Sequence, residues 1–131
     1  MHRRHFVQGL LAGAIVLSAA RAEARCAPIP VRLDAAQSRY VFEGVIETVS
    51  DSDVVFRVVA TWKGTPPAHA RLRFSGRMRM SAAQVGQTYV VFARGDSDDA
   101  LSWARCGGTG TLSETRTSEL TAIGLTRRVM P

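Results

Sequence analysis

Two runs of β-forming residues joined by a short polar turn constrain the fold of this chain more than any other feature. Residues 40–49 and 54–62 are rich in Val, Ile, Phe and Tyr, and Asp51, Ser52 and Asp53 lie between them. β-Branched and aromatic residues favour strands, while Asp and Ser favour turns because their side chains bond to nearby backbone groups. The pattern predicts an antiparallel hairpin.

Three further runs predict strands, over residues 70–74, 88–93 and 101–106. The run 88–93 is nearly all apolar, which is typical of a strand buried on both faces. In the run 70–74, Arg71 and Arg73 alternate with Leu72 and Phe74, so charged and apolar side chains are expected on opposite faces. Residues 77–80 continue this alternation after a bend at Gly76.

Helical signals flank the predicted strands. Residues 33–38 predict a short helical turn, and residues 113–123 predict a C-terminal helix that Ser113 caps and Gly124 ends. Gly107, Gly108 and Gly110 predict a flexible connection before this helix. Five short strands with an N-terminal helical turn and a C-terminal helix predict a mainly β fold, a small barrel.

The first 24 residues are typical of a removable export signal. Arg3 and Arg4, followed by an aromatic and an aliphatic residue, resemble the twin-arginine pattern. The apolar run over residues 6–20 would span about 22 Å as a helix, short of the ~30 Å core of a bilayer. Small residues predict cleavage after Ala24, which leaves residues 25–131 as the mature domain. The alternatives are an uncleaved N-terminal anchor and a lipoprotein, although Arg25 departs from the small residue that precedes a lipidated cysteine.

Export predicts a periplasmic or secreted protein with no membrane span after removal of the leader. The whole chain has 17 Lys and Arg against 11 Asp and Glu, a formal net charge of +6. The leader holds three Arg and one Glu, so the mature part carries +4. This mildly basic balance, together with export, argues against a dedicated nucleic-acid binder.

Cys26 and Cys106 are the two cysteines of the chain, 80 positions apart. In an exported protein such a pair is expected to form one disulfide, worth roughly 4 kcal/mol on the loop-entropy model. A metal site and a redox pair are the alternatives. Tetrahedral zinc needs three or four ligands, whereas His69 is the single His of the mature part, and redox cysteines are usually close in sequence. We therefore expect a structural disulfide, with no metal and no cofactor.

Several strings resemble bacterial netrin-like domains, which are relatives of the tissue inhibitors of metalloproteinases (TIMPs). The matching strands are residues 41–46, residues 58–64 with their Trp-Lys-Gly ending, and residues 85–93. Cys106, the Gly-rich stretch after it and the terminal helix are similar to the closing segment of the family. The resemblance covers residues 26–124 and implies a five-stranded oligonucleotide/oligosaccharide-binding (OB) barrel with flanking helices.

The resemblance also implies a second possible activity, inhibition of a metalloprotease through the segment Cys26, Ala27 and Pro28. Animal inhibitors begin with Cys-x-Cys, and their terminal amine and first carbonyl chelate the zinc of the protease. In this chain Arg25 precedes Cys26 after the predicted cleavage, and the second cysteine of the pattern is missing. Both departures argue against chelation in the same way.

Other candidate groups favour structural interpretations. His69 would have to serve any Ser-His or Cys-His arrangement, but it lies where a loop is expected to enter a strand, and a surface His is the simpler interpretation. Two sets of clustered carboxylates occur where hairpin turns are expected, so turn chemistry explains them better than cation binding: Asp51 and Asp53, and Asp96, Asp98 and Asp99. Trp62 and Trp103 are expected in the core or at the barrel rim.

The row Arg71, Arg73, Arg77 and Arg79 is the main candidate binding surface, because alternation would aim all four guanidinium groups to one side. Such a row suits phosphates, sulfated glycans or anionic lipid headgroups. The alternative is a solvated outer strand face that discourages edge-to-edge aggregation.

The sequence thus predicts an exported, non-catalytic and monomeric binding module. Its expected partner is an envelope or extracellular protein, or an anionic glycan or lipid headgroup. No catalytic residues are assigned, and metalloprotease inhibition is the alternative.

Overall fold

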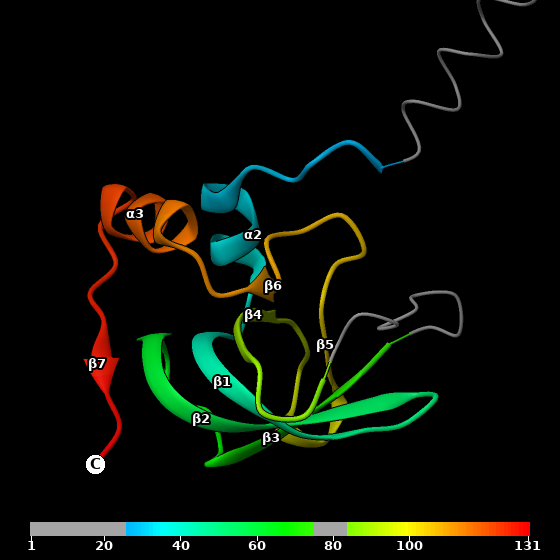
Figure 1. Cartoon of the computed structure of the whole chain (residues 1–131). Helices are drawn as coiled ribbons and strands as arrows, with labels where there is room; N and C mark the ends of the chain where they lie inside the picture. The colour runs from blue at the N-terminus through cyan, green and yellow to red at the C-terminus, as the bar shows by residue number, and fades with distance from the viewer. Residues whose placement is uncertain (1–25, 75–83) are drawn as a thin grey trace, which may run out of the picture.

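A computed structural model of the chain describes residues 26–74 and 84–131 (Figure 1). The predicted leader over residues 1–24, Arg25, and the bend and alternation predicted over residues 76–80 lie outside the described residues. The described elements run in the order α2 (Val31–Gln37), β1 (Tyr40–Val49), β2 (Asp53–Lys63), β3 (His69–Arg73), β4 (Thr88–Ala93), η2 (Asp98–Ala100), β5 (Leu101–Ser102), β6 (Gly110–Thr111), α3 (Glu114–Ala122) and β7 (Arg128–Val129).

The strands form one curled, open sheet in the order β5-β3-β2-β1-β4-β6, and β7 pairs with β2 outside this path. The predicted hairpin is β1 and β2, which pair antiparallel over their whole length. The mainly β fold is confirmed, but the described residues contain seven strands rather than five. The two unpredicted strands, β6 and β7, have two residues each, which is too short for a sequence pattern to show.

The prediction of a strand over residues 101–106 was too long, because β5 ends at Ser102. There the backbone of Ser102 exchanges two hydrogen bonds with Arg94, of 2.7 and 2.9 Å. The chain then turns, and the Cys106 carbonyl accepts a hydrogen bond from the Ile29 N–H at 3.0 Å. Contact with the N-terminal segment therefore takes the place of strand pairing.

The inside of the curl holds the larger core, to which all five predicted strands contribute. Its largest fully buried side chains are Phe42 and Phe56, which meet edge-to-face with ring centroids 6.0 Å apart. Trp103 lies at the margin of this core, as expected, and stacks on Phe74 at 6.0 Å.

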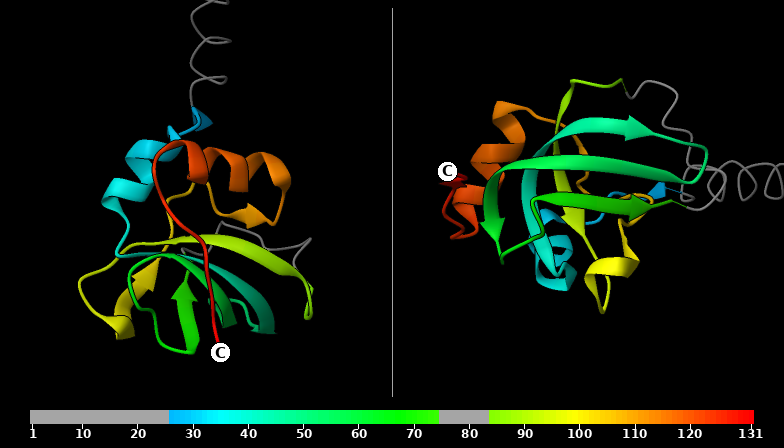
Figure 2. Two further views of the ribbon diagram at one scale, coloured as in Figure 1. Left: turned by 90° about the vertical axis from the view of Figure 1, so that its left-hand side faces the viewer. Right: turned by 90° about the horizontal axis from the view of Figure 1, so that it is seen from below.

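A second core lies on the other side of β1 and β4, beneath the two helices (Figure 2). Val90 and Phe92 of β4 face it, while Val91 and Ala93 face the first core, so β4 is buried on both faces as predicted. Trp62 joins this second core because β2 has one extra residue at that point: Val41 pairs with Lys63 and Phe42 with Thr61. Such a bulge re-aims a side chain.

The predicted C-terminal helix is confirmed as α3. The Ser113 hydroxyl accepts a hydrogen bond from the Arg116 N–H at 3.1 Å, and Gly124 follows the helix with φ +93°. Leu120 is its buried contact with the second core. None of the helices in the described ranges is long and apolar enough to cross a membrane.

Covalent and ionic contacts fasten the N-terminal part to the sheet. Cys26 and Cys106 are at disulfide distance, with an S–S separation of 2.02 Å and Cα atoms 5.5 Å apart. Asp34 on α2 is fully buried, and it accepts hydrogen bonds from Arg94 at 2.7 Å and from the Gly108 N–H at 2.6 Å. The disulfide pair is compatible with an extracytoplasmic location.

Gly107 and Gly108, two of the three glycines predicted to form a flexible connection, are closely packed. A Cβ on Gly107 would lie 2.4 Å from Asp34 Oδ2, and a Cβ on Gly108 would lie 2.6 Å from the Phe92 ring. The chain therefore passes so close to α2 and β4 that only hydrogen fits.

The Trp62-Lys63-Gly64 segment lies at the C-terminal end of α2. The Lys63 ammonium donates hydrogen bonds to the carbonyl oxygens of Ala35 at 2.9 Å and Ser38 at 2.6 Å, which satisfies the C-terminal end of the helix. Gly64 has φ +74°, and a Cβ there would lie 2.7 Å from Tyr40.

We predict that Gly108→Ala lowers the free energy of unfolding by about 1–3 kcal/mol, because the added methyl group overpacks the contact with Phe92. Gly110→Ala is the matched control: a Cβ there has no atom within 4 Å, so its effect should stay within about 0.5 kcal/mol. Urea unfolding measures both variants. Equal unfolding midpoints of the two variants would show that the close approach at Gly108 does not contribute to the free energy of unfolding.

Candidate functional site

Arginine side chains gather on the outer face of β2 and β3. On β3, Arg71 and Arg73 are exposed while Ala70 and Leu72 are buried, so the predicted alternation is confirmed. Arg57 on β2 is exposed on the same face, because it pairs with His69 in the register between the two strands. We call Arg57, Arg71 and Arg73 the arginine face. Arg77 and Arg79, the other half of the predicted row, lie outside the described residues.

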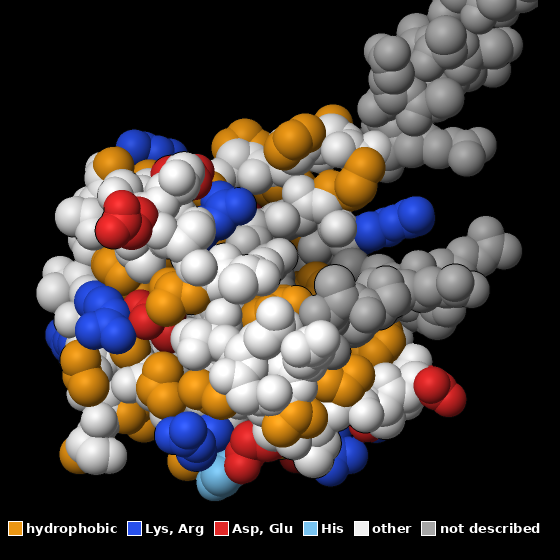
Figure 3. All heavy atoms as spheres, in the orientation of Figure 1, with side chains coloured by type: hydrophobic (Ala, Val, Ile, Leu, Met, Phe, Trp, Pro, Cys, Tyr) orange, Lys and Arg blue, Asp and Glu red, His pale blue; other side chains and the backbone are white. Residues whose placement is uncertain are grey.

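Acidic side chains neutralise part of the arginine face. Arg71 Nη1 lies 3.3 Å from Asp53 Oδ2, and the exposed His69 ring contacts Glu47. Within the described ranges, Arg57 and Arg73 form no ion pair. Figure 3 shows basic and acidic side chains side by side along the lower rim of the molecule. The sequence did not suggest Arg57, because only the pairing of β2 with β3 places it opposite His69 and diagonal to Arg71.

The N-terminal candidate segment is accessible. Cys26, Ala27 and Pro28 are all exposed, and the disulfide to Cys106 and the Ile29 hydrogen bond hold them against the end of the sheet. The segment lies near α2, away from the arginine face (Figure 1).

Of the carboxylates predicted to lie in hairpin turns, Asp53 begins β2 and contacts Arg71, and Asp98 and Asp99 lie in η2. The backbone of Asp53 closes the turn before β2, where its N–H donates a hydrogen bond to the Ser50 hydroxyl at 3.0 Å. Asp98 accepts a hydrogen bond from the Tyr40 hydroxyl at 2.6 Å and lies 3.5 Å from Arg39. No group of three His, Cys, Asp or Glu among the described residues is placed to hold a metal ion.

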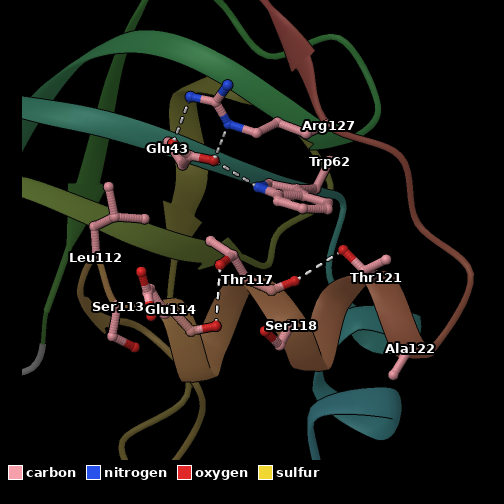
Figure 4. A pocket seen from close by; sticks show the side chains of 10 residues that line it. All are labelled: Glu43, Trp62, Leu112, Ser113, Glu114, Thr117, Ser118, Thr121, Ala122 and Arg127. Carbon is pink, nitrogen blue, oxygen red and sulfur yellow. Dashed lines mark hydrogen bonds and ion pairs between the residues drawn. The ribbon is translucent and has the colours of Figure 1, made fainter.

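A groove of about 780 Å³ opens beside α3, and the sequence did not suggest it. We call it the α3 groove. One wall is the helix and the segment that leads into it, and the floor belongs to β1, β2 and the chain after α3 (Figure 4). Its lining residues are Glu43, Trp62, Leu112, Ser113, Glu114, Thr117, Ser118, Thr121, Ala122 and Arg127.

The floor of the α3 groove is built on Glu43, a buried residue that is 1% exposed. Its Oε2 accepts hydrogen bonds from Trp62 Nε1 at 2.8 Å and from Arg127 Nε at 2.7 Å, and its Oε1 accepts one from Arg127 Nη2 at 3.0 Å. The Arg127 contact is thus bidentate, the strongest and most directional form of an Arg–carboxylate pair.

These contacts keep Glu43 charged. Burial by itself raises the pKa of Glu43, but hydrogen bonds from Arg127 and Trp62 and the charge of Arg127 outweigh it, so the pKa lies below its ordinary value. The hydrogen bond to Glu43 raises the pKa of Arg127 in turn. A Glu in an otherwise buried strand is a signal that a partner is needed. The sequence does not show which of many arginines supplies it, 84 positions away.

We predict that Arg127→Met lowers the free energy of unfolding by about 2 kcal/mol at neutral pH, because Glu43 then stays buried with Trp62 as its remaining partner. Since the folded pKa of Glu43 is lowered, the pair stabilises the fold above the ordinary carboxyl pKa and loses this effect as the pH falls through the folded pKa. The difference from the wild type should therefore be largest at neutral pH and shrink at an acidic pH below the folded pKa of Glu43.

Urea unfolding at both pH values measures the Arg127→Met effect. Arg128→Met is the control, since this neighbouring arginine is exposed and forms no ion pair with the described residues. A loss that is independent of pH, or an equal loss in Arg128→Met, would contradict the role of the pair.

Comparisons with known proteins do not assign the chain to a family. No family model matches it, and a search of curated proteins found no match. The resemblance to netrin-like domains therefore stays a prediction, and function has to be inferred from the geometry of the two surfaces and the N-terminal segment.

Proposed function

We propose that this protein is an exported, non-catalytic binding module with a netrin-like OB barrel, which binds an anionic envelope component through its arginine face. The observation that carries the proposal is the projection of Arg57, Arg71 and Arg73 from one exposed face of two paired strands. Its expected location is the periplasm or the outside of the cell.

The strand arrangement supports the barrel. β1 lies between β2 and β4, and β3 pairs in parallel with β5. The two backbone hydrogen bonds between Arg94 and Ser102 join the end of β4 to β5. The first and last strands of the path β5-β3-β2-β1-β4 therefore contact each other at one point, as closure of a five-stranded barrel requires. Strands β6 and β7 are short additions to this path.

The arginine face suits phosphate, sulfate or carboxylate groups. Arg71 and Arg73, two residues apart on β3, lie about 7 Å apart, and Arg57 on the neighbouring strand is diagonal to Arg71, so the three positions extend over roughly 15 Å of one face. Each guanidinium is a planar fork of N–H donors that fits an anionic group. Asp53 and Glu47 reduce the net charge of the patch, so the binding should be moderate and sensitive to salt.

The surroundings of His69 favour a binding role over a catalytic one. His69, the candidate base of a catalytic arrangement, is exposed on this same face and contacts Glu47. Its surroundings are those of a surface histidine on a strand, which supports a non-catalytic role for this part of the molecule.

We predict that Arg57→Ser with Arg73→Ser weakens binding to vesicles rich in phosphatidylglycerol roughly thirtyfold, at about 1 kcal/mol per arginine. The same pair should also lower the salt concentration that elutes the protein from immobilised heparin. Cosedimentation and column retention measure the two effects. Loss on vesicles alone would indicate a lipid headgroup, and loss on heparin alone a sulfated glycan.

Arg32→Ser with Arg105→Ser is the matched control, because it removes the same charge from exposed positions outside the arginine face. Binding of this control should stay close to that of the wild type. An equal loss in both double variants would show that net charge, and not the arginine face, is responsible, and the proposal would fail.

Metalloprotease inhibition is the second candidate, favoured by the exposure of Cys26, Ala27 and Pro28 beside the disulfide. Its requirement is a free α-amino group on Cys26 that can approach a zinc ion. Any residue ahead of Cys26 would displace that amine.

We predict that mass spectrometry of the exported protein finds Arg25 as the first residue, and that this protein does not inhibit a zinc endopeptidase such as thermolysin. A mature chain that begins at Cys26 would instead favour inhibition and weaken the binding proposal. An intact Met1 would contradict the export signal.

A further inference from the structure

We infer that the α3 groove is a second binding site, which takes a neutral polyhydroxylated ligand of the size of a short saccharide. Its volume of about 780 Å³ lies within the range of sites for small organic ligands. The inference rests on residues outside the arginine face, so a failure of the proposed function would not affect it.

The groove floor keeps unused hydrogen-bonding capacity in fixed positions. A carboxylate has about four acceptor positions, and Glu43 uses three of them for Trp62 and Arg127. The fourth position, on Oε1, is buried with the rest of Glu43, so it is not offered to a ligand. Arg127 uses two of its five N–H donors on Glu43, and its side chain is 45% exposed, so further donors are available at the floor. Donors on the floor and hydroxyl acceptors on the helix wall together match hydroxyl groups, which can both donate and accept.

The charge of the groove favours a neutral ligand. Glu43 and Arg127 neutralise each other through the bidentate contact, and Glu114 is the remaining charged lining residue. Glu114 lies in the first turn of α3, where the positive end of the helix dipole offsets a carboxylate. An anion would meet two carboxylates, and a cation would compete with Arg127 for Glu43.

The helix wall adds small hydroxyl side chains. Thr117 and Thr121 donate their hydroxyl protons to the carbonyl oxygens of Glu114 and Thr117, which leaves both hydroxyl oxygens as acceptors (Figure 4). Ser118 is exposed between them, and Ala122 leaves space at the end of the groove. Polar groups of this kind recognise hydroxyls without adding charge.

The groove also has apolar surface, which would contact the apolar faces of a saccharide ring. Leu112 is 39% exposed at one end of the groove, and the Trp62 indole contributes to the floor. Saccharide rings carry hydroxyls at their edges and C–H groups on their faces. A groove that combines apolar surface with the donors of Arg127 and the hydroxyl acceptors of α3 can therefore contact both.

The test is an NMR titration of the purified protein with maltose, cellobiose and N,N′-diacetylchitobiose, each up to about 10 mM, a range that detects millimolar affinity. The two tryptophans give separate indole N–H signals. Trp62 Nε1 donates to Glu43 at the floor of the groove, whereas Trp103 lies in the other core and serves as the internal reference. We expect at least one disaccharide to shift the Trp62 signal in a saturable way and to leave the Trp103 signal unchanged.

Ser118→Tyr is expected to fill the groove and to raise the dissociation constant at least tenfold. Thr115→Tyr, on an exposed position of α3 that does not line the groove, should bind as the wild type does. Ala122→Tyr is a second blocking variant if Ser118→Tyr does not fold. The inference is overturned if no disaccharide shifts the Trp62 signal, if galacturonic acid or pentaglycine shifts it in place of the neutral sugars, or if the blocking variants bind normally.

Discussion

A carboxylate buried in the central strand of a sheet has to be neutralised, and much of this structure follows from how Glu43 meets that requirement. Its partner Arg127 belongs to the chain after α3, so the pair ties the C-terminal segment to β1 and places β7 against β2. The second partner, Trp62, reaches Glu43 because the bulge in β2 turns the indole toward the helices. The desolvation of two charged groups is costly, and only the bidentate contact and the indole hydrogen bond together offset it.

The N-terminal part of the domain is fastened by a different set of contacts around α2, a helix of seven residues that is too short to be stable alone. Asp34 joins it to Arg94 and Gly108, Lys63 satisfies its last carbonyls, and the disulfide holds the segment before it. A domain of this size buries a modest core, so such attachments carry a large share of its stability.

These attachments leave two free surfaces of different chemistry. The arginine face lies on β2 and β3, where neither α2 nor α3 covers the outer side of the sheet (Figure 1), and its partial neutralisation by Asp53 and Glu47 suits a salt-sensitive contact with an anion. The α3 groove lies on the covered side, where the helix meets the Glu43 floor; Glu43 and Arg127 neutralise each other there, and Glu114 is the remaining charge. The same scaffold thus offers a basic surface and a groove of low charge, and export would present both to the cell envelope.

The sequence by itself determined the elements with strong local signals: the hairpin of β1 and β2, the doubly buried β4, the alternation of Arg71 and Arg73, the capped α3 and the pairing of the two cysteines. These follow from periodicity, turn chemistry and capping, which act over a few residues, or from the absence of another partner. Only the tertiary structure decided the partner of Glu43, the addition of Arg57 to the arginine face, the two-residue strands β6 and β7, and the tight packing of Gly107 and Gly108. Each of these depends on contacts between distant segments, and local preferences carry no information about which distant segments will meet.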